Sequence, residues 1–404
     1  MKIKVLIVTD SPQIQTGQGI VHREIGQGLY NLGYDVISLG WGKGKSLDLS
    51  MPWKIYSPES TKDYYGKNMF DAIISTERPD IVLTIGDTWA HSHIVKSRYR
   101  GLFQWVGYVA IDGVAFDGGI PETWKNVIND MDKIVAYTNY GRDAIGKSLP
   151  IEKDNIELIY HGIDLTKFYT KTDVEKTALR KKAGIPEDAI VYLFVARNQF
   201  RKNVPEVFKA WSKFTANGKH PNAMLFPHMV FNDPMGWNLF EVIDTCNIKS
   251  SVMYLTEFAN SGSNIDVISY EQLNVLYNAC DICLLMSGEG FGLPLFEAMA
   301  CSKPIITINH SACQELVKSR GELVDVLTTI TGVHTTERPI FSTDSLVEKL
   351  DLLYNNTELR TKYGKLGNEY VQNYTWEKMS LQWDKLLQKV MNSFADTCKV
   401  TVIS

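Results

Sequence analysis

Short apolar runs separated by amphipathic segments fill the first part of the chain. Strands are predicted over 4–10, 35–40, 80–87, 103–112, 133–138 and 156–164. Residues 19–33 have the apolar spacing of a helix that ends at Gly33. Because apolar strands that alternate with helices are typical of a parallel sheet covered on both faces, we expect a Rossmann-like domain over 1–168.

The same scheme starts again after residues 165–175, which are polar, lack apolar periodicity and predict a linker. Further strands are predicted over 189–198, 224–229, 252–257, 281–287 and 303–308, with helices such as 204–214 and 270–279 between them. We therefore expect a second Rossmann-like domain over 176–375. Residues 376–404 are expected to form a C-terminal helix and tail that packs back through Trp376 and Trp383. The predicted fold class is α/β, with two facing Rossmann-like domains.

The composition is that of a globular protein, with 44% hydrophobic and 22% charged residues among 404. A formal net charge of −4 gives no overall attraction to nucleic acid or an anionic membrane. No apolar run approaches the roughly 20 residues that cross a bilayer, and the N-terminus does not resemble a signal peptide. We expect a cytoplasmic protein without a transmembrane segment, and peripheral attachment to a membrane stays open.

The stretch SGEGFGLPLFE, residues 287–297, combines two glutamates with a glycine-rich turn after an apolar strand. Pro294 predicts the start of a helix, which places Glu289 in the loop and Glu297 inside the helix. Gly290 and Gly292 allow a close approach of the backbone to a ligand, and the first amides of the helix favour phosphate or hydroxyl groups. The residues alone fit either a helix start or a sugar-nucleotide site.

The stretch ARNQFRKN, residues 196–203, follows the first apolar strand of the second domain. Arg197 and Lys202 could bracket a pyrophosphate, with the arginine as a fork and the lysine as a point charge. A solvated basic turn before a helix is the alternative.

Loops of the first domain carry further candidates. Gly17 belongs to TGQG after the first strand, but the third glycine of a dinucleotide fingerprint is missing, so a nicotinamide or flavin site is not expected. Asp112 stands at the end of the strand predicted over 103–112 and could orient an acceptor hydroxyl. His161 fits a structural role better than a catalytic one. Asp130 and Asp132 match a DxD pattern at a helix end, where we interpret them as a cap and a surface acid. No metal site is predicted.

Together these residues resemble the family-four retaining glycosyltransferases of GT-B architecture, also called glycosyltransferase group 1. The resemblance rests on EGFGLPLFE followed by AMACSKPII, on ARNQFRKN, and on YHGIDLTKF, LNVLYNACDICLLMS and YTWEKMSLQW in the same order, and covers most of 130–390. It implies that Arg197 and Lys202 bind the donor diphosphate and stabilise it as it leaves. It implies that Glu297 binds the ribose and that Glu289 contacts the transferred sugar. The amides that would assist belong to Gly290, Phe291, Gly292 and Leu293.

The resemblance also implies that Gly17 lies near the donor phosphate and the acceptor. Many members of the family have a histidine where this chain has Asp112, so the positioning of acceptor or sugar is expected to differ. The implied reaction is a metal-independent transfer with retention, in which the acceptor attacks from the face that the diphosphate leaves, and it needs no cofactor beyond the nucleoside diphosphate sugar. The acceptor stays open among a glycan, a glycolipid, a small molecule and modified nucleic acid. A sugar-nucleotide binding module without transfer and a GT-B epimerase are the alternatives.

Overall fold

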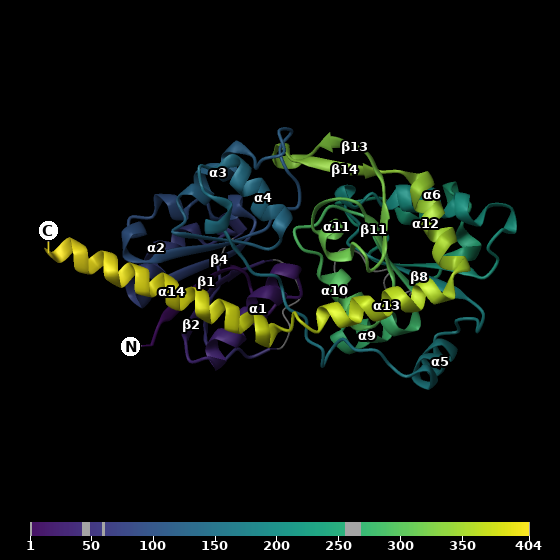
Figure 1. Cartoon of the computed structure of the whole chain (residues 1–404), viewed down its shortest axis with the longest axis horizontal. Coiled ribbons are helices and arrows are strands. Elements are labelled where there is room, and N and C mark those ends of the chain that lie inside the picture. The colour runs from purple at the N-terminus through teal and green to yellow at the C-terminus, as the bar shows by residue number, and fades with distance from the viewer. Residues whose placement is uncertain (1, 43–48, 59–60, 255–267, 404) are drawn as a thin grey trace. The chain divides into compact units, whose positions relative to one another are not determined.

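The computed structural model describes residues 2–42, 49–58, 61–254 and 268–403 (Figure 1). The chain divides into two compact units, of which the first joins Met1–Gly162 to Trp376–Ser404 and the second is Ile163–Thr375. Among the described residues, no helix is both long enough and apolar enough to cross a bilayer.

The first unit is built on a parallel sheet of seven strands in the order β3-β2-β1-β4-β5-β6-β7. The strands are β1 Lys4–Asp10, β2 Asp35–Trp41, β3 Lys54–Tyr56, β4 Ile81–Gly86, β5 Gln104–Val109, β6 Lys133–Ala136 and β7 Glu157–Leu158. The helices are α1 Gly17–Asn31, α2 Lys67–Glu77, α3 Glu122–Asn129, α4 Asn139–Ser148 and α14 Trp376–Ile403. The central strands are buried on both faces, as their unbroken apolar runs predict.

Two details of this sheet differ from the sequence prediction. The short edge strand β3 was not expected, because its three residues carry no apolar run. The strand predicted over 156–164 is limited to β7, since the chain then leaves the sheet and the amide of Ile163 donates to the carbonyl of Tyr374 at 2.8 Å.

Helix α14 packs along α1 in the first unit (Figure 1). Gly28 of α1 lies directly against Ser380, where a Cβ atom would stand only 1.9 Å from its hydroxyl oxygen. The Tyr34 hydroxyl donates to the Asp384 carboxylate at 2.7 Å, and Trp383 is buried against Tyr108 with ring centroids 4.9 Å apart. The C-terminal helix is therefore part of the first unit.

The second unit is built on a parallel sheet of five strands in the order β12-β11-β10-β8-β9. The strands are β8 Ile190–Val195, β9 Ala223–His228, β10 Ile282–Leu285, β11 Ile305–Ile308 and β12 Glu322–Val324. The helices are α5 Asp173–Lys182, α6 Val204–Thr215, α7 Leu239–Thr245, α9 Tyr270–Ala279, α10 Leu293–Ala300, α11 Ser311–Val317, α12 Thr343–Asn355 and α13 Thr357–Val371. An antiparallel hairpin, β13 Val326–Thr331 with β14 Glu337–Phe341, was not predicted. Of the strand predicted over 252–257, Val252 forms one bridge to Leu225, and residues 255–257 lie outside the described residues.

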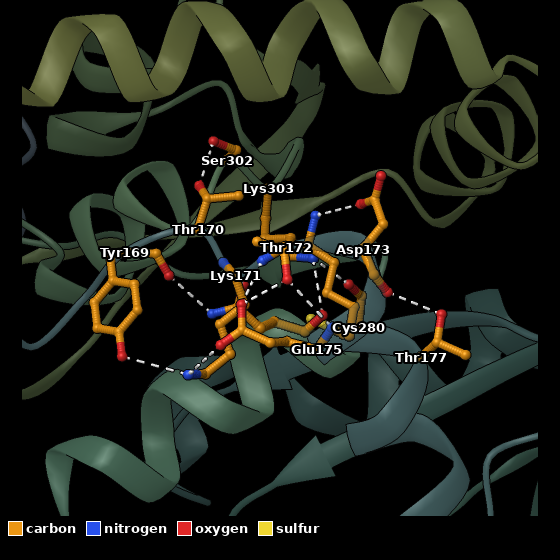
Figure 2. Close-up of polar contacts among 12 residues, drawn as sticks. Tyr169, Thr170, Lys171, Thr172, Asp173, Glu175, Thr177, Cys280, Ser302 and Lys303 are labelled. Carbon is orange, nitrogen blue, oxygen red and sulfur yellow. Dashed lines mark hydrogen bonds and ion pairs between the residues drawn. The ribbon is translucent and has the colours of Figure 1, made fainter.

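The segment predicted as a linker, 165–175, is docked on the second unit (Figure 2). The amides of Tyr169 and Lys171 donate to the side-chain carbonyls of Asn274 and Asn278 at 3.2 and 2.8 Å. The hydroxyl of Thr170 bonds that of Ser302 at 2.6 Å. These partners lie more than 100 residues away in the sequence, so no local pattern indicates that the segment is fixed.

Each sheet has one place where the strand order reverses, between β1 and β4 in the first and between β8 and β10 in the second. In open α/β sheets the loops that follow such neighbouring strands diverge and leave a crevice for ligands. The α/β prediction is confirmed, and the loops at these two switch points carry several of the sequence candidates.

Candidate functional site

The switch point of the second sheet brings ARNQFRKN and SGEGFG together, although they lie almost ninety residues apart. Strand β8 runs into a 3₁₀ turn, Phe200–Lys202, and β10 runs into the glycine-rich loop. Because β8 and β10 are adjacent, with Tyr192 opposite Ile282, their following loops meet. The Lys202 ammonium forms an ion pair with the Glu289 carboxylate at this point.

This ion pair is buried, since Lys202 is 7% exposed. Burial acts to raise the pKa of the Glu289 carboxyl, but the nearby charges of Lys202 and Arg201 outweigh it and hold that pKa below its ordinary value. Burial lowers the pKa of Lys202, and the negative charge of Glu289 offsets part of this effect. The Arg201 guanidinium lies 3.8 Å from the second carboxylate oxygen of Glu289. The two basic residues therefore surround one carboxylate.

Two serines fix the position of Glu289. The Ser287 hydroxyl donates to the Glu289 carboxylate at 2.5 Å. The backbone amide of Glu289 donates to the Ser311 hydroxyl at 3.0 Å. Ser311 has a left-handed backbone with φ of 52°, an unfavourable conformation for serine that aims its hydroxyl at this loop. Neither serine was a sequence candidate, although Ser287 stands in the quoted motif.

The glycine-rich loop ends at Gly292, which has φ of 96° and caps α10. This left-handed conformation favours glycine, so Gly292 is required by the turn itself. Helix α10 begins at Leu293, one residue before the predicted start at Pro294. Phe291 is buried and packs edge-on against Phe296 at 4.8 Å between ring centroids, which holds the loop with Gly290 close to the helix.

Glu297 lies in α10 and is buried, at 7% exposure. The Tyr277 hydroxyl, from α9, donates to its carboxylate at 2.7 Å. Burial raises the pKa of Glu297 to about 7, because one neutral hydrogen bond does not compensate for lost solvation. Glu289 and Glu297 thus occupy different environments, the first ionised beside two cations and the second poised near neutrality.

Arg197, which was expected to bracket a pyrophosphate with Lys202, forms an ion pair with Asp233. Its Nε donates to the carboxylate of the buried Asp233 at 2.9 Å, while 60% of its side chain stays exposed. Asn198 is fully buried and clamps the loop after β9, since it donates to the Trp237 carbonyl at 2.7 Å and accepts from the Trp237 amide at 3.1 Å. Asn198 and Asp233 were not predicted as site residues. The stretch FNDPMGW, residues 231–237, contains the turn formers Asn, Asp, Pro and Gly, and was the available sign of an ordered loop.

Gly17 begins α1 at the switch point of the first sheet. Thr16 caps this helix: its hydroxyl accepts from the amide of Gly19 at 3.0 Å and donates to the Asp10 carboxylate at 2.5 Å. Burial raises the pKa of Asp10, although the Thr16 hydroxyl lowers it in part. The loop of Gly17 is therefore fixed by the end of β1.

The other candidates of the first unit lie outside the loop of Gly17. Asp112 lies three residues beyond β5 and is partly buried. His161 is buried beside the Tyr108 hydroxyl, at 2.8 Å from Nδ1, and burial lowers its pKa to about 3. Asp130 and Asp132 both form ion pairs with Arg100, at 2.9 and 3.0 Å, and Asp132 also accepts from the Trp105 amide. The DxD pattern is therefore engaged in a structural salt bridge.

The chain is similar to proteins of known family and structure. Residues 249–370 match the family model described as glycosyl transferases group 1. The N-acetyl-alpha-D-glucosaminyl L-malate synthase of Bacillus anthracis is 23% identical over 97% of this chain and 98% of its own length. An uncharacterized glycosyltransferase of Methanocaldococcus jannaschii is also 23% identical, over 66% of this chain, which spans about 62% of that relative.

Among solved structures, HepE of Anabaena in complex with UDP-glucose superposes with a TM-score of 0.74, over 96% of this chain and 100% of that chain, at 14% identity. This likeness concerns the fold. Residues 249–370 thus match the group 1 glycosyl transferase model, within a chain that has the GT-B fold.

Proposed function

We propose that this protein is a retaining glycosyltransferase that moves a sugar from a nucleoside diphosphate sugar to an acceptor hydroxyl without a metal ion. The proposal is carried by the buried pair of Lys202 and Glu289 at the β8/β10 switch point, with Glu297 in the helix that follows. Buried charges at such a crevice are costly for folding and are typical of functional sites.

The basic residues suit the diphosphate. Lys202 and Arg201 lie at the loop where a leaving diphosphate would accumulate charge, and the exposed part of Arg197 can reach a phosphate while Asp233 holds its Nε. The N-terminal amides of α10 add partial positive charge at the same loop. These groups would stabilise the leaving group where many other enzymes use a cation.

The two glutamates suit hydroxyl groups of different parts of the donor. Glu297 accepts one hydrogen bond from Tyr277, and a carboxylate has room for several more. A ribose diol would supply two such donors. Glu289 is ionised and fixed by Ser287 and Lys202, so it can accept a hydroxyl of the transferred sugar beside the diphosphate.

For the chemistry, the bond between the anomeric carbon and the diphosphate oxygen breaks while a bond to the acceptor oxygen forms on the same face. The acceptor proton passes to the departing diphosphate oxygen. The residues of this site then position and stabilise charge, and none has to form a covalent intermediate. The relatives do not identify the acceptor, but the UDP-glucose bound to HepE makes that compound the first donor to test.

The test combines a nucleotide-sugar panel with matched lysine variants. Lys202→Ala should abolish nucleotide binding or turnover, whereas Lys209→Ala, which removes an exposed lysine paired with Glu206, should leave both unchanged. NMR of the product should show an unchanged anomeric configuration, and activity should survive EDTA. Tight nucleotide-sugar binding without hydrolysis or transfer would identify a binding module. Conversion of the donor without an acceptor would identify an epimerase.

A further inference from the structure

Tyr277 lies on α9 and contacts the helix that carries Glu297. Its side chain is fully buried, two residues before the end of α9 at Ala279. Its hydroxyl donates to the Oε2 oxygen of Glu297 at 2.7 Å and lies 3.4 Å from the backbone carbonyl of Pro294, both in α10. One hydroxyl proton therefore has two acceptors on the helix that carries the glutamate.

The position of Tyr277 is fixed by the docked segment, residues 165–175. Phe168 is buried and lies edge-on to the Tyr277 ring, with centroids 6.1 Å apart. Asn274 and Asn278, which flank Tyr277 in α9, accept hydrogen bonds from two backbone amides of the same segment. A side chain that is buried and held by such neighbours presents its hydroxyl at a defined point.

Glu297 keeps one carboxylate oxygen for a ligand. Within the described residues, Tyr277 is the hydrogen-bond partner of this carboxylate and takes Oε2, which leaves Oε1 to accept from a ligand. A buried carboxylate with a single hydrogen bond has lost most of its solvation, so the donor groups of a ligand would restore part of that loss.

We propose that Tyr277 is a positioning residue, which holds Oε2 of Glu297 so that Oε1 accepts the ribose hydroxyls of the donor. This role rests on the proposed function, since it concerns the group that would bind the ribose. A hydrogen bond to the ionised form of a carboxyl stabilises that form. Removal of the Tyr277 hydroxyl should therefore weaken donor binding through lost orientation and through protonation of the carboxylate.

The other titratable groups that face this pair are two thiols. Burial raises the pKa of Cys283 and of Cys301 well above the ordinary value, so both stay neutral. The buried Lys303 ammonium acts on these thiols and donates to two backbone carbonyls at the C-terminal end of α9, at 3.2 and 2.7 Å. Burial also raises the pKa of Tyr277, so its hydroxyl stays protonated and can donate. For Glu297, burial raises the pKa to about 7 against the hydrogen bond from Tyr277, which lowers it.

The test is Tyr277→Phe, which keeps the buried ring and removes the hydroxyl alone. UDP-glucose and its 2′-deoxyribose analogue are titrated calorimetrically between pH 6 and pH 9. At pH 8 the variant should bind UDP-glucose about tenfold more weakly than the parent, and the pH midpoint of binding should rise by about one pH unit. The parent should prefer UDP-glucose to the analogue about tenfold, and the variant at most about threefold.

Tyr363→Phe is the matched control. It removes a hydrogen bond of the same length, 2.7 Å, from another tyrosine of this unit to the carboxylate of Glu322, and should leave the donor Kd and the midpoint unchanged. With Glu297→Gln in place, Tyr277→Phe should change the donor Kd less than about twofold, because the tyrosine acts through the glutamate. A tyrosine that only stabilises the fold would lower the free energy of unfolding without moving the midpoint or the preference for ribose.

A second perturbation of the same hydroxyl covers the case in which Tyr277→Phe does not fold. Replacement of Tyr277 by 3-fluorotyrosine keeps the hydroxyl and makes it a stronger hydrogen-bond donor. The midpoint of donor binding should then fall instead of rise. A midpoint equal to that of the parent would overturn the inference.

The outcomes also separate this role from the proposed function. If the parent transfers sugar while Tyr277→Phe keeps the parental midpoint and ribose preference, the inference is overturned and the proposed function stands. If no nucleotide sugar binds the parent, the proposed function fails, and a carbon-13 NMR titration of the Glu297 carboxyl decides the role of Tyr277 without a donor. A higher titration midpoint in Tyr277→Phe supports that role, and an equal one overturns it.

Discussion

If Glu297 binds the donor as we propose, nucleotide-sugar binding should depend on pH in the neutral range. The carboxyl is buried in α10, accepts one hydrogen bond from Tyr277, and has a pKa of about 7. If the ribose hydroxyls donate to it, the donor binds the ionised form and displaces the proton. Binding should therefore strengthen as the pH rises through 7.

The size of the effect follows from the ionised fraction. With a pKa of about 7, roughly one-tenth of the protein carries an ionised Glu297 at pH 6 and roughly nine-tenths at pH 8. The apparent Kd should thus rise about tenfold from pH 8 to pH 6. A nucleotide sugar is the right probe, because its diphosphate is substituted at both ends and does not titrate in this range.

Glu297 also affects stability, with the opposite sign. Its pKa rises from an ordinary 4.5 to about 7 on folding, so the unfolded chain releases the proton first as the pH rises. Stability is unaffected below 4.5, falls between 4.5 and 7, and stays reduced above 7 by at most about 3 kcal/mol. Glu297→Gln removes this penalty. The variant should be more stable than the parent at pH 8 and similar to it at pH 4.

Isothermal titration in buffers of different ionisation enthalpy measures both Kd and the protons released. The parent should release about half a proton per site at pH 7. Glu297→Gln should bind weakly, with a Kd that does not change between pH 6 and pH 8, while urea unfolding reports its gain in stability. A parental Kd independent of pH, or the same pH dependence in the variant, would refute the assignment of Glu297 to the donor.

Three further predictions concern the residues around the site. Lys202→Met leaves the buried Glu289 without its lysine partner and should cost about 3–5 kcal/mol of unfolding free energy, measured by denaturation. The double variant Lys202→Met with Glu289→Gln should regain that stability but show no turnover in an activity assay. Asp233→Asn releases the exposed Arg197 and should raise the donor KM several-fold, with less than about 1 kcal/mol lost in urea unfolding; an unchanged KM would contradict a role for Arg197 at the diphosphate. His161→Ala should cost about 2–4 kcal/mol in urea unfolding yet leave the nucleotide Kd unchanged, and a large change in that Kd would contradict its structural assignment.

Periodicity was sufficient to predict most strands and both sheets, because buried parallel strands have apolar runs that stand out from the helices between them. It failed for β3 and for the β13–β14 hairpin, whose residues are short or largely exposed and depend on neighbours rather than on local pattern. It also predicted a linker at 165–175, where the amides of Tyr169 and Lys171 donate to the side chains of Asn274 and Asn278. Such pairings join positions about a hundred residues apart and leave no local signal.

The same limit applies to charge at the candidate site. The sequence presents Arg197 and Lys202 as a basic pair and Glu289 as a separate motif, which suggests a strongly positive pocket for phosphate. In the structure Lys202 and Arg201 both pair with Glu289, and Arg197 pairs with Asp233, so these three cations and two carboxylates leave one net positive charge. A diphosphate bound there, as we propose, would share these cations with the carboxylates that already hold them. The cations are therefore held in place before the donor arrives, and the ordering of their long side chains is a cost of folding rather than of donor binding.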